Sequence, residues 1–159
     1  MIVLQAPTAA DTRRVGRALA ALSHEGDIIL LVGPLGAGKT VLASGLAEGL
    51  GVTEVLVSPS FILARTYADG FMPLVHADVY RIGTSGEFMD LDLVDMAREG
   101  LLIVEWGDAV AALLPDTCLT VEISVAGSGS RTIRLRPRGP WCDRPLEELV
   151  KAVHLEREP

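Results

Sequence analysis

The segment Gly33–Thr40 (GPLGAGKT) constrains this chain more than any other feature. It has the pattern GxxxxGK(S/T), in which x is any residue. The aliphatic run Ile28–Val32 precedes it directly and is typical of a strand buried on both faces of a mainly parallel sheet. Leucines with four-residue spacing follow it at Leu42, Leu46 and Leu50. The sequence therefore predicts a strand, a glycine-rich loop and a helix in immediate succession.

This arrangement predicts a loop that binds phosphate. Glycine adopts backbone conformations with positive φ, so successive N–H groups can converge on a phosphate at the N-terminus of the helix. The ammonium group of Lys39 would offset the charge of the β- and γ-phosphates, and the hydroxyl group of Thr40 would ligate Mg²⁺. An ordinary strand-to-helix turn also favours glycine, but it does not require lysine followed by threonine. We expect nucleotide contacts from Gly33, Gly36, Ala37, Gly38, Lys39, Thr40 and Val41.

The elements around this unit indicate an α/β fold with a mixed sheet. Before it, a short strand at residues 2–4 is followed by a capping box of Thr8 and Asp11, which begins an amphipathic helix that we expect to end near Gly26. After it come, in order, a hairpin over residues 61–75, irregular or short helical structure over 83–100, a strand at 101–104, a hairpin over 119–135 and an amphipathic helix over 146–153.

Two acidic residues compete for the role of the carboxylate that a nucleotide hydrolase needs at the end of a second buried strand. Glu105 follows the aliphatic run Leu101–Val104, and Asp78 follows the looser run Pro73–Ala77. An acid in this position can also be only a solvated strand end, so the pattern leaves both candidates open.

Three further features have a functional and a structural interpretation. Ser58-Pro59-Ser60 could present hydroxyl groups to phosphate or Mg²⁺, or form a simple turn. For His76, within an apolar run, a packed position is favoured over catalysis. Arg134, Arg136 and Arg138 alternate along one strand, for which we favour a solvated edge strand over a docking surface.

Composition excludes several classes of protein. The 159 residues suffice for one domain spanning 1–159, and 49% hydrophobic residues provide a core. The net charge of −7 is unfavourable for direct nucleic-acid binding. Two cysteines without neighbouring metal-ligand residues indicate neither a disulfide framework nor a zinc site. No apolar run reaches the roughly 18 residues of a membrane span, and the first residues lack the design of a secretion signal, so we expect a cytoplasmic protein.

Taken together, four segments closely resemble the TsaE (YjeE) family of small bacterial P-loop ATPases, which are required for threonylcarbamoyladenosine modification of tRNA. They are GPLGAGKT at 33–40, SPSF at 58–61, HADVYR at 76–81 and VEW at 104–106, within a match over about residues 8–137. The loop is generic to such enzymes, whereas the combination of the other three is specific.

The resemblance implies roles for particular residues. Thr40 and Glu105 would hold Mg²⁺, Asp78 would be a catalytic or metal-proximal acid, and residues 58–61, with Ser60 as the catalytic hydroxyl group, would act as a switch. It also implies nucleotide contacts from Thr8 and Arg131. The chain departs from the family pattern at three positions, which affects details of phosphate and ribose contact: these are Pro34, Val41 and Ser60.

We therefore expect a P-loop NTPase fold with a mixed central sheet and helices on both faces. The expected activity is Mg²⁺-dependent hydrolysis of ATP to ADP and phosphate. By resemblance it would operate with the TsaD and TsaB proteins, with tRNA engaged only through them. A small-molecule P-loop kinase and a non-enzymatic nucleotide switch are the alternatives, although the stretch 83–100 has only Arg98 where a kinase would carry an arginine-rich lid.

Overall fold

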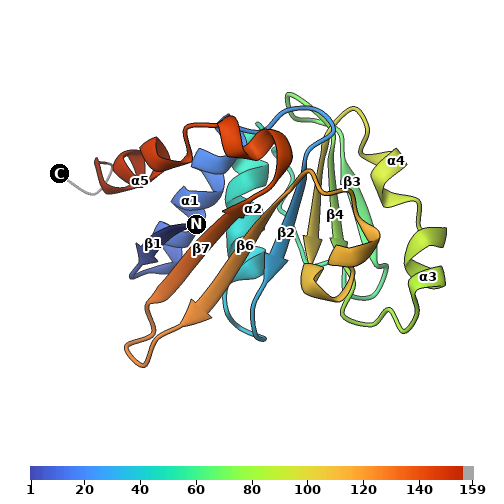
Figure 1. Cartoon of the computed structure of the whole chain (residues 1–159), viewed down its shortest axis with the longest axis horizontal. Coiled ribbons are helices and arrows are strands. Elements are labelled where there is room, and N and C mark those ends of the chain that lie inside the picture. Colours follow the sequence, from blue (N-terminus) through green and yellow to red (C-terminus); the bar gives the residue numbers. More distant parts are fainter. Residues whose placement is uncertain (156–159) are drawn as a thin grey trace.

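The strand before the glycine-rich loop lies in the interior of a seven-stranded sheet (Figure 1). The computed structural model describes residues 1–155 of the chain. The strand order is β1-β7-β6-β2-β5-β4-β3. The strands are β1 (Ile2–Ala6), β2 (Ile28–Val32), β3 (Ala64–Tyr67), β4 (Leu74–Asp78), β5 (Leu101–Glu105), β6 (Cys118–Val125) and β7 (Arg131–Pro137).

The sheet is mixed, as predicted. Neighbouring strands among β6, β2, β5 and β4 pair in parallel. β3 pairs with β4, β7 with β6 and β1 with β7, all antiparallel. Two hairpins, β3–β4 and β6–β7, were expected from the turn signals between their strands, and both are present. Because the four central strands run in one direction, their carboxyl ends meet at one edge of the sheet, where α/β proteins bind ligands.

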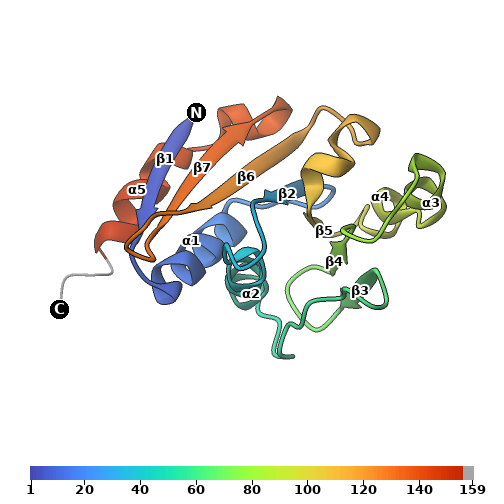
Figure 2. The same cartoon turned by 90° about the horizontal axis from the view of Figure 1, so that it is seen from below.

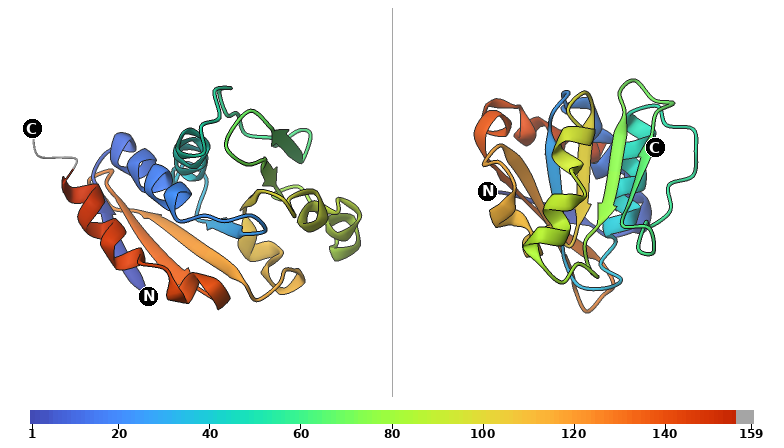
Figure 3. Two further views of the ribbon diagram at one scale, coloured as in Figure 1. Left: turned by 90° about the horizontal axis from the view of Figure 1, so that it is seen from above. Right: turned by 90° about the vertical axis from the view of Figure 1, so that its right-hand side faces the viewer.

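Helices cover both faces of the sheet (Figure 2). The helices are α1 (Ala9–Ala21), α2 (Lys39–Gly49), α3 (Ser85–Asp90), α4 (Leu93–Met96) and α5 (Leu146–Leu155), with short 3₁₀ turns at 107–109, 111–113 and 139–143. Side chains alternate along β2, so Ile29 and Leu31 pack with α1 and α2, whereas Ile28 and Leu30 pack with α3 and α4. α5 lies against α1 and β1 (Figure 3).

Two predicted boundaries differ from the structure. α1 ends at Ala21, where Leu22 caps it, instead of near Gly26, because His24–Asp27 forms a turn. The first strand extends to Ala6. The stretch 83–100 contains the two short helices α3 and α4, which agrees with the expected helical fragments. Within residues 1–155, no helix combines the length and apolar character required to cross a membrane.

The prediction that Arg134 and Arg136 lie on an edge strand is wrong. β7 lies between β1 and β6, so both of its sides are paired. The two guanidinium groups instead contact Glu122 of β6 across the ladder, at 3.8 and 2.8 Å. Arg138 lies just beyond β7 and contacts Asp116 at 3.1 Å. β1 lies near the start of the chain and β7 is more than a hundred residues away in the sequence. The spacing of the arginines along β7 does not predict this long-range pairing.

Glycines allow α1 and α2 to approach within backbone contact. A Cβ atom at Gly16 would lie 2.2 Å from the carbonyl oxygen of Leu42, and one at Gly45 would lie 2.1 Å from that of Arg13. Neither distance is compatible with a side chain. Since α2 begins at the glycine-rich loop, this contact fixes the helix that carries Lys39 and Thr40.

We predict that Gly45→Ala lowers the free energy of unfolding by about 3 kcal/mol, because the added methyl group must push two helix backbones apart. Urea-induced unfolding followed by circular dichroism measures the change. Gly86→Ala is the matched control, since a Cβ atom there meets only the Thr84 hydroxyl group at 3.9 Å. The control should shift stability by no more than about 1 kcal/mol. Equal effects of the two substitutions would contradict the tight contact.

Candidate nucleotide-binding site

The glycine-rich loop connects β2 to α2 with a backbone that requires glycine. Gly33, Gly36 and Gly38 have φ angles of 154°, 77° and 107°. A Cβ atom at Gly33 would also lie 2.4 Å from the carbonyl oxygen of Ile123. Gly38 caps the N-terminus of α2 in the left-handed conformation and leaves the first amides of the helix without a side-chain acceptor. Such amides are ready donors for an anion.

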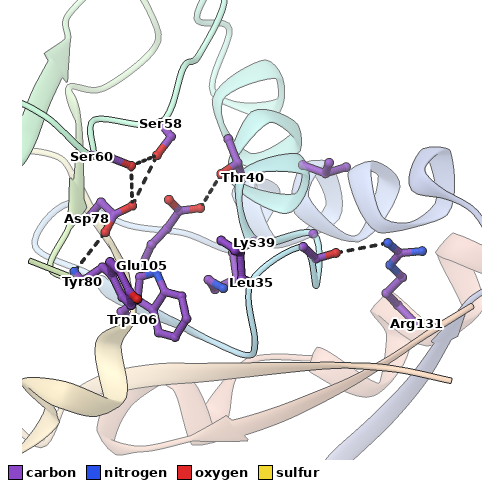
Figure 4. Close-up of a pocket in the computed structure, with 13 residues that line it drawn as sticks. Leu35, Lys39, Thr40, Ser58, Ser60, Asp78, Tyr80, Glu105, Trp106 and Arg131 are labelled. Carbon is purple, nitrogen blue, oxygen red and sulfur yellow. Dashed lines mark hydrogen bonds between the residues drawn. The ribbon is translucent and has the colours of Figure 1, made fainter. Parts of the chain in front are cut away.

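Lys39 folds back over its own loop (Figure 4). Its Nζ atom donates hydrogen bonds to the carbonyl oxygens of Gly33, at 2.7 Å, and Pro34, at 2.9 Å. The same atom lies 4.1 Å from the ring centroid of Trp106, within the range of a cation–π interaction. Only 6% of the residue is exposed. The ammonium group is therefore held over the glycine-rich loop by three contacts.

Burial and nearby carboxylates have opposite effects on the pKa of Lys39. Burial lowers the pKa of its ammonium group from the ordinary value. The carboxylates of Glu105, Asp78 and Asp108 act against this and raise the pKa, with Glu105 having the largest electrostatic effect of the three. The protonated state of Lys39 therefore depends on the acidic residues at the adjacent strand ends.

Glu105 and Thr40 make a direct side-chain contact in the site. The Thr40 hydroxyl group donates to Oε1 of Glu105 at 2.8 Å. Glu105 is the last residue of β5 and is 2% exposed, whereas Thr40 lies in the first turn of α2. The two predicted metal ligands, which are far apart in the sequence, are thus brought together by the parallel pairing of β2 and β5.

Asp78 ends β4 directly beside Glu105 in the sheet register, but it has different partners. Its Oδ2 atom accepts hydrogen bonds from the hydroxyl groups of Ser60, at 3.1 Å, and Ser58, at 3.3 Å. Its Oδ1 atom accepts the backbone N–H of Tyr80 at 3.0 Å. Figure 4 shows these contacts converging on one carboxylate. Asp78 therefore anchors residues 58–61, called the serine loop below, whereas Glu105 contacts the threonine of the glycine-rich loop.

A cavity of ≈ 420 Å³ joins these groups. Arg131, from the start of β7, lies at one end and donates hydrogen bonds to the carbonyl oxygens of Ala37, at 3.2 Å, and Gly36, at 3.3 Å. The residues that line the cavity are Leu35, Gly36, Gly38, Lys39, Thr40, Val41, Ser58, Ser60, Asp78, Tyr80, Glu105, Trp106 and Arg131. Predicted site residues from five separate segments, namely the glycine-rich loop, Ser60, Asp78, Glu105 and Arg131, therefore share one cavity.

Three predicted contacts are not among the residues that line the cavity. Gly33 and Ala37 belong to the loop and act through its backbone. Thr8 forms the predicted capping box, in which its hydroxyl group and its N–H both donate to Asp11. The hydroxyl group of Thr8 is thus engaged at the start of α1.

Two aromatic residues of the site received no role from the sequence. The rings of Tyr80 and Trp106 lie 4.7 Å apart between their centroids, and Trp106 also covers Lys39. Trp106 directly follows Glu105 in the motif VEW, and Tyr80 follows Asp78 after one intervening residue in the motif HADVYR. That position was the available signal, because a residue just after the carboxyl end of a central strand lies at the ligand-binding edge.

We predict that Glu105→Gln lowers the pKa of Lys39 further, since it removes the largest electrostatic opposition to burial. Nuclear magnetic resonance titration of side-chain lysine signals measures this directly, because the chain has only Lys39 and Lys151. Asp108→Asn is the control and should lower the pKa by a smaller amount. A Lys39 titration that is unchanged in Glu105→Gln would contradict the electrostatic coupling.

The strand, loop, helix and converging acids define an α/β protein of the P-loop NTPase fold. The profile described as "Threonylcarbamoyl adenosine biosynthesis protein TsaE" matches residues 6–133, and the chain belongs to the TsaE family. A relative named tRNA threonylcarbamoyladenosine biosynthesis protein TsaE, from Bacillus subtilis, is 37% identical over 141 residues, which are 89% of each chain. Its namesake from Streptomyces coelicolor is 44% identical over 118 residues, covering 72% of this chain and 79% of the relative.

A solved structure supports the same assignment. The crystal structure of Bacillus subtilis YdiB superposes with a TM-score of 0.75 at 30% sequence identity. The superposition covers 99% of this chain and 96% of that chain. The fold predicted from the sequence is therefore confirmed over nearly the whole length.

Proposed function

We propose that this protein binds ATP with Mg²⁺, hydrolyses it to ADP and phosphate, and thereby supports threonylcarbamoyladenosine modification of tRNA. The observation that carries the proposal is the 2.8 Å contact between the Thr40 hydroxyl group and the Glu105 carboxylate beside a phosphate-binding loop. The names of the relatives in the TsaE family support the role in tRNA modification.

The residues fit a magnesium ion. Thr40 and Glu105 offer only oxygen ligands, which Mg²⁺ prefers. Within residues 1–155 there is no group of three or more His, Cys, Asp or Glu side chains that could hold a metal by themselves. This agrees with an ion that is held by one or two protein oxygens and completed by phosphate and water. When bound, the ion would neutralise charge that develops on the transferring phosphoryl group.

The chain's own groups would bind and orient the phosphates. The amides at the start of α2 would donate to phosphate oxygens, and Lys39 would exchange its two bonds to loop carbonyl groups for bonds to phosphate. Arg131 would contribute at the other end of the cavity, next to the carbonyl groups of Gly36 and Ala37. Asp78 would hold Ser58 and Ser60 over the site. Positioning and electrostatic stabilisation are the main sources of catalysis in phosphoryl transfer.

The proposed partners are the TsaD and TsaB proteins, and the proposed location of the complex is the cytoplasm. The net charge of −7 supports action through proteins, because direct tRNA binding relies on Lys and Arg residues that neutralise phosphates, and acidic residues outnumber them here. Contact with tRNA would then be indirect.

Phosphate release by the purified chain, alone and with the TsaD–TsaB pair, tests the activity over a panel of nucleotides and small-molecule acceptors. We expect release of phosphate from ATP that requires Mg²⁺ and rises with the pair. Transfer to an acceptor would instead identify a kinase, and tight binding without turnover would identify a switch. Lys39→Ala is the control for the site and should lose most ATP affinity, since it removes a charge-assisted contact worth about 1.5–3 kcal/mol.

We predict that Glu105→Gln keeps ATP affinity within an order of magnitude but lowers Mg²⁺-dependent turnover at least 100-fold. The amide has nearly the same shape as the carboxylate but lacks its charge. Calorimetric titration and steady-state phosphate release measure the two quantities separately. Wild-type turnover in the presence of the partners would transfer the metal-linked role from Glu105 to Asp78.

We predict that residues 58–61 exchange amide hydrogens more slowly with a non-hydrolysable ATP analogue than with ADP. Hydroxyl groups of such a loop can be ordered by the γ-phosphate and Mg²⁺ and released when the phosphate leaves. Ser60→Ala should weaken hydrolysis while it keeps nucleotide binding. Hydrogen exchange detected by mass spectrometry reports the loop. Equal exchange in both nucleotide states, with normal turnover of Ser60→Ala, would reduce the segment to a structural turn.

A further inference from the structure

His76 is a buried polar residue that the proposed function does not use. It lies in β4 between β3 and β5 and is 0% exposed. Because side chains alternate along a strand, His76 points to the same face as Asp78, two residues further on. Neither of its ring nitrogens has a hydrogen-bond partner among the described residues. Its packed position agrees with the sequence analysis, but an apolar side chain would fill that position without an unsatisfied polar group.

The ring is aimed at the carboxylate of Glu105. Nε2 of His76 lies 3.5 Å from Oε2 of Glu105. This is beyond the usual 2.7–3.2 Å range for an N–H···O bond, so the contact is incomplete here. The other carboxylate oxygen, Oε1, accepts the hydroxyl group of Thr40. The two oxygens of Glu105 therefore face two different neighbours.

The proton of a neutral His76 belongs on Nε2. In this tautomer an N–H group points towards the carboxylate, which attracts it. With the proton on Nδ1, a ring lone pair would face the negative Oε2 atom, which is repulsive. In this tautomer Nε2 of His76 is the donor and Oε2 of Glu105 is the acceptor. Their separation exceeds the usual hydrogen-bond distance by a few tenths of an ångström.

We propose that His76 is a positioning residue that fixes the plane of the Glu105 carboxylate for Mg²⁺. The inference rests on the proposed function, since it concerns how the metal-linked acid is oriented. The terminal torsion of a glutamate is broad, so the single bond from Thr40 leaves the carboxylate free to rotate. The His76 N–H at Oε2 restricts that rotation, in the same way that hydrogen-bond partners usually orient the side chains that ligate a metal.

The consequence is specific to the metal. Substitution of His76 leaves the charge of Glu105, the phosphate-binding loop and Lys39 in place. Nucleotide binding without a divalent ion should therefore stay within twofold of the wild type. The affinity of the nucleotide-bound protein for the metal should fall about 10- to 100-fold, as for other residues that orient a ligand. A merely structural role would affect both quantities together or neither.

His76→Phe is the first variant, because a phenyl ring fills the space of the imidazole without an N–H group. His76→Gln is the restoring variant, since its terminal amide can donate from near the Nε2 position. His76→Asn is matched to it but carries its amide near the Nδ1 position. Trp141→Phe is the control for the loss of a buried ring N–H, because Trp141 Nε1 also has no hydrogen-bond partner within residues 1–155 but lies in the core outside the site.

The experiment measures Mn²⁺ affinity by electron paramagnetic resonance with a non-hydrolysable ATP analogue, and affinity for the analogue in EDTA by calorimetry. Imidazole nitrogen shifts of ¹⁵N-labelled protein give the tautomer of His76. We expect the proton of His76 on Nε2 and weakened Mn²⁺ affinity in His76→Phe and His76→Asn. His76→Gln should recover at least half of the lost Mn²⁺ affinity, on a logarithmic scale. Trp141→Phe should match the wild type.

Three results would overturn the inference. One is wild-type Mn²⁺ affinity in both His76→Phe and His76→Asn, and another is a proton on Nδ1. The third is an equal loss of Mn²⁺ affinity in His76→Gln and His76→Asn. If His76→Phe does not fold, this comparison of the two amide variants decides the question. If the wild-type protein binds no Mn²⁺ with the analogue, both the proposed function and this inference fail. Normal metal binding by the wild type together with unaffected variants would refute only the role of His76.

Discussion

The parallel register of β2, β5 and β4 is the constraint on which the candidate site depends. It sets Leu31 level with Glu105, and Glu105 level with Asp78. The loop that leaves β2 therefore starts beside two carboxylates, and the first turn of α2 brings Thr40 onto one of them. A slip of one residue would turn both acids to the opposite face of the sheet, because side chains alternate along a strand. The buried aliphatic residues that set the register of these strands thus also set the positions of the two carboxylates at their ends.

The charges at this edge explain why a divalent ion suits the proposed activity. Lys39, Asp78 and Glu105 are all buried, and each has hydrogen-bond partners that offset its loss of water. One ammonium group faces two carboxylates, so the groups already carry excess negative charge before any phosphate arrives. A triphosphate would add to that excess, against which only Arg131 at the other end of the cavity and the partial charge of the helix N-terminus act. A bound cation next to Glu105 would balance both the carboxylate and the phosphates.

The sequence predicted the local unit of the site well and its long-range arrangement less well. The strand, glycine-rich loop and helix follow from adjacent residues, and so do the acids at the ends of β4 and β5. The interior position of β7 depends on pairing with β1, from the opposite end of the chain, which arginine spacing does not reveal. The separate partners of Asp78 and Glu105 also depend on which loop packs over which strand. Similar patterns at the two acids therefore did not distinguish them, whereas the structure gives them different hydrogen-bond partners.

The serine loop and the lysine of the phosphate-binding loop lie at opposite ends of one continuous set of contacts. Ser60 bonds to Asp78, which accepts the backbone N–H of Tyr80. The ring of Tyr80 packs against Trp106, whose ring lies against the Lys39 ammonium group. In the proposed function, bound phosphate would draw Lys39 away from one end, and ordering of residues 58–61 would alter the other. Tyr80 and Trp106 link the two ends, so the two proposed events would both act on this aromatic pair.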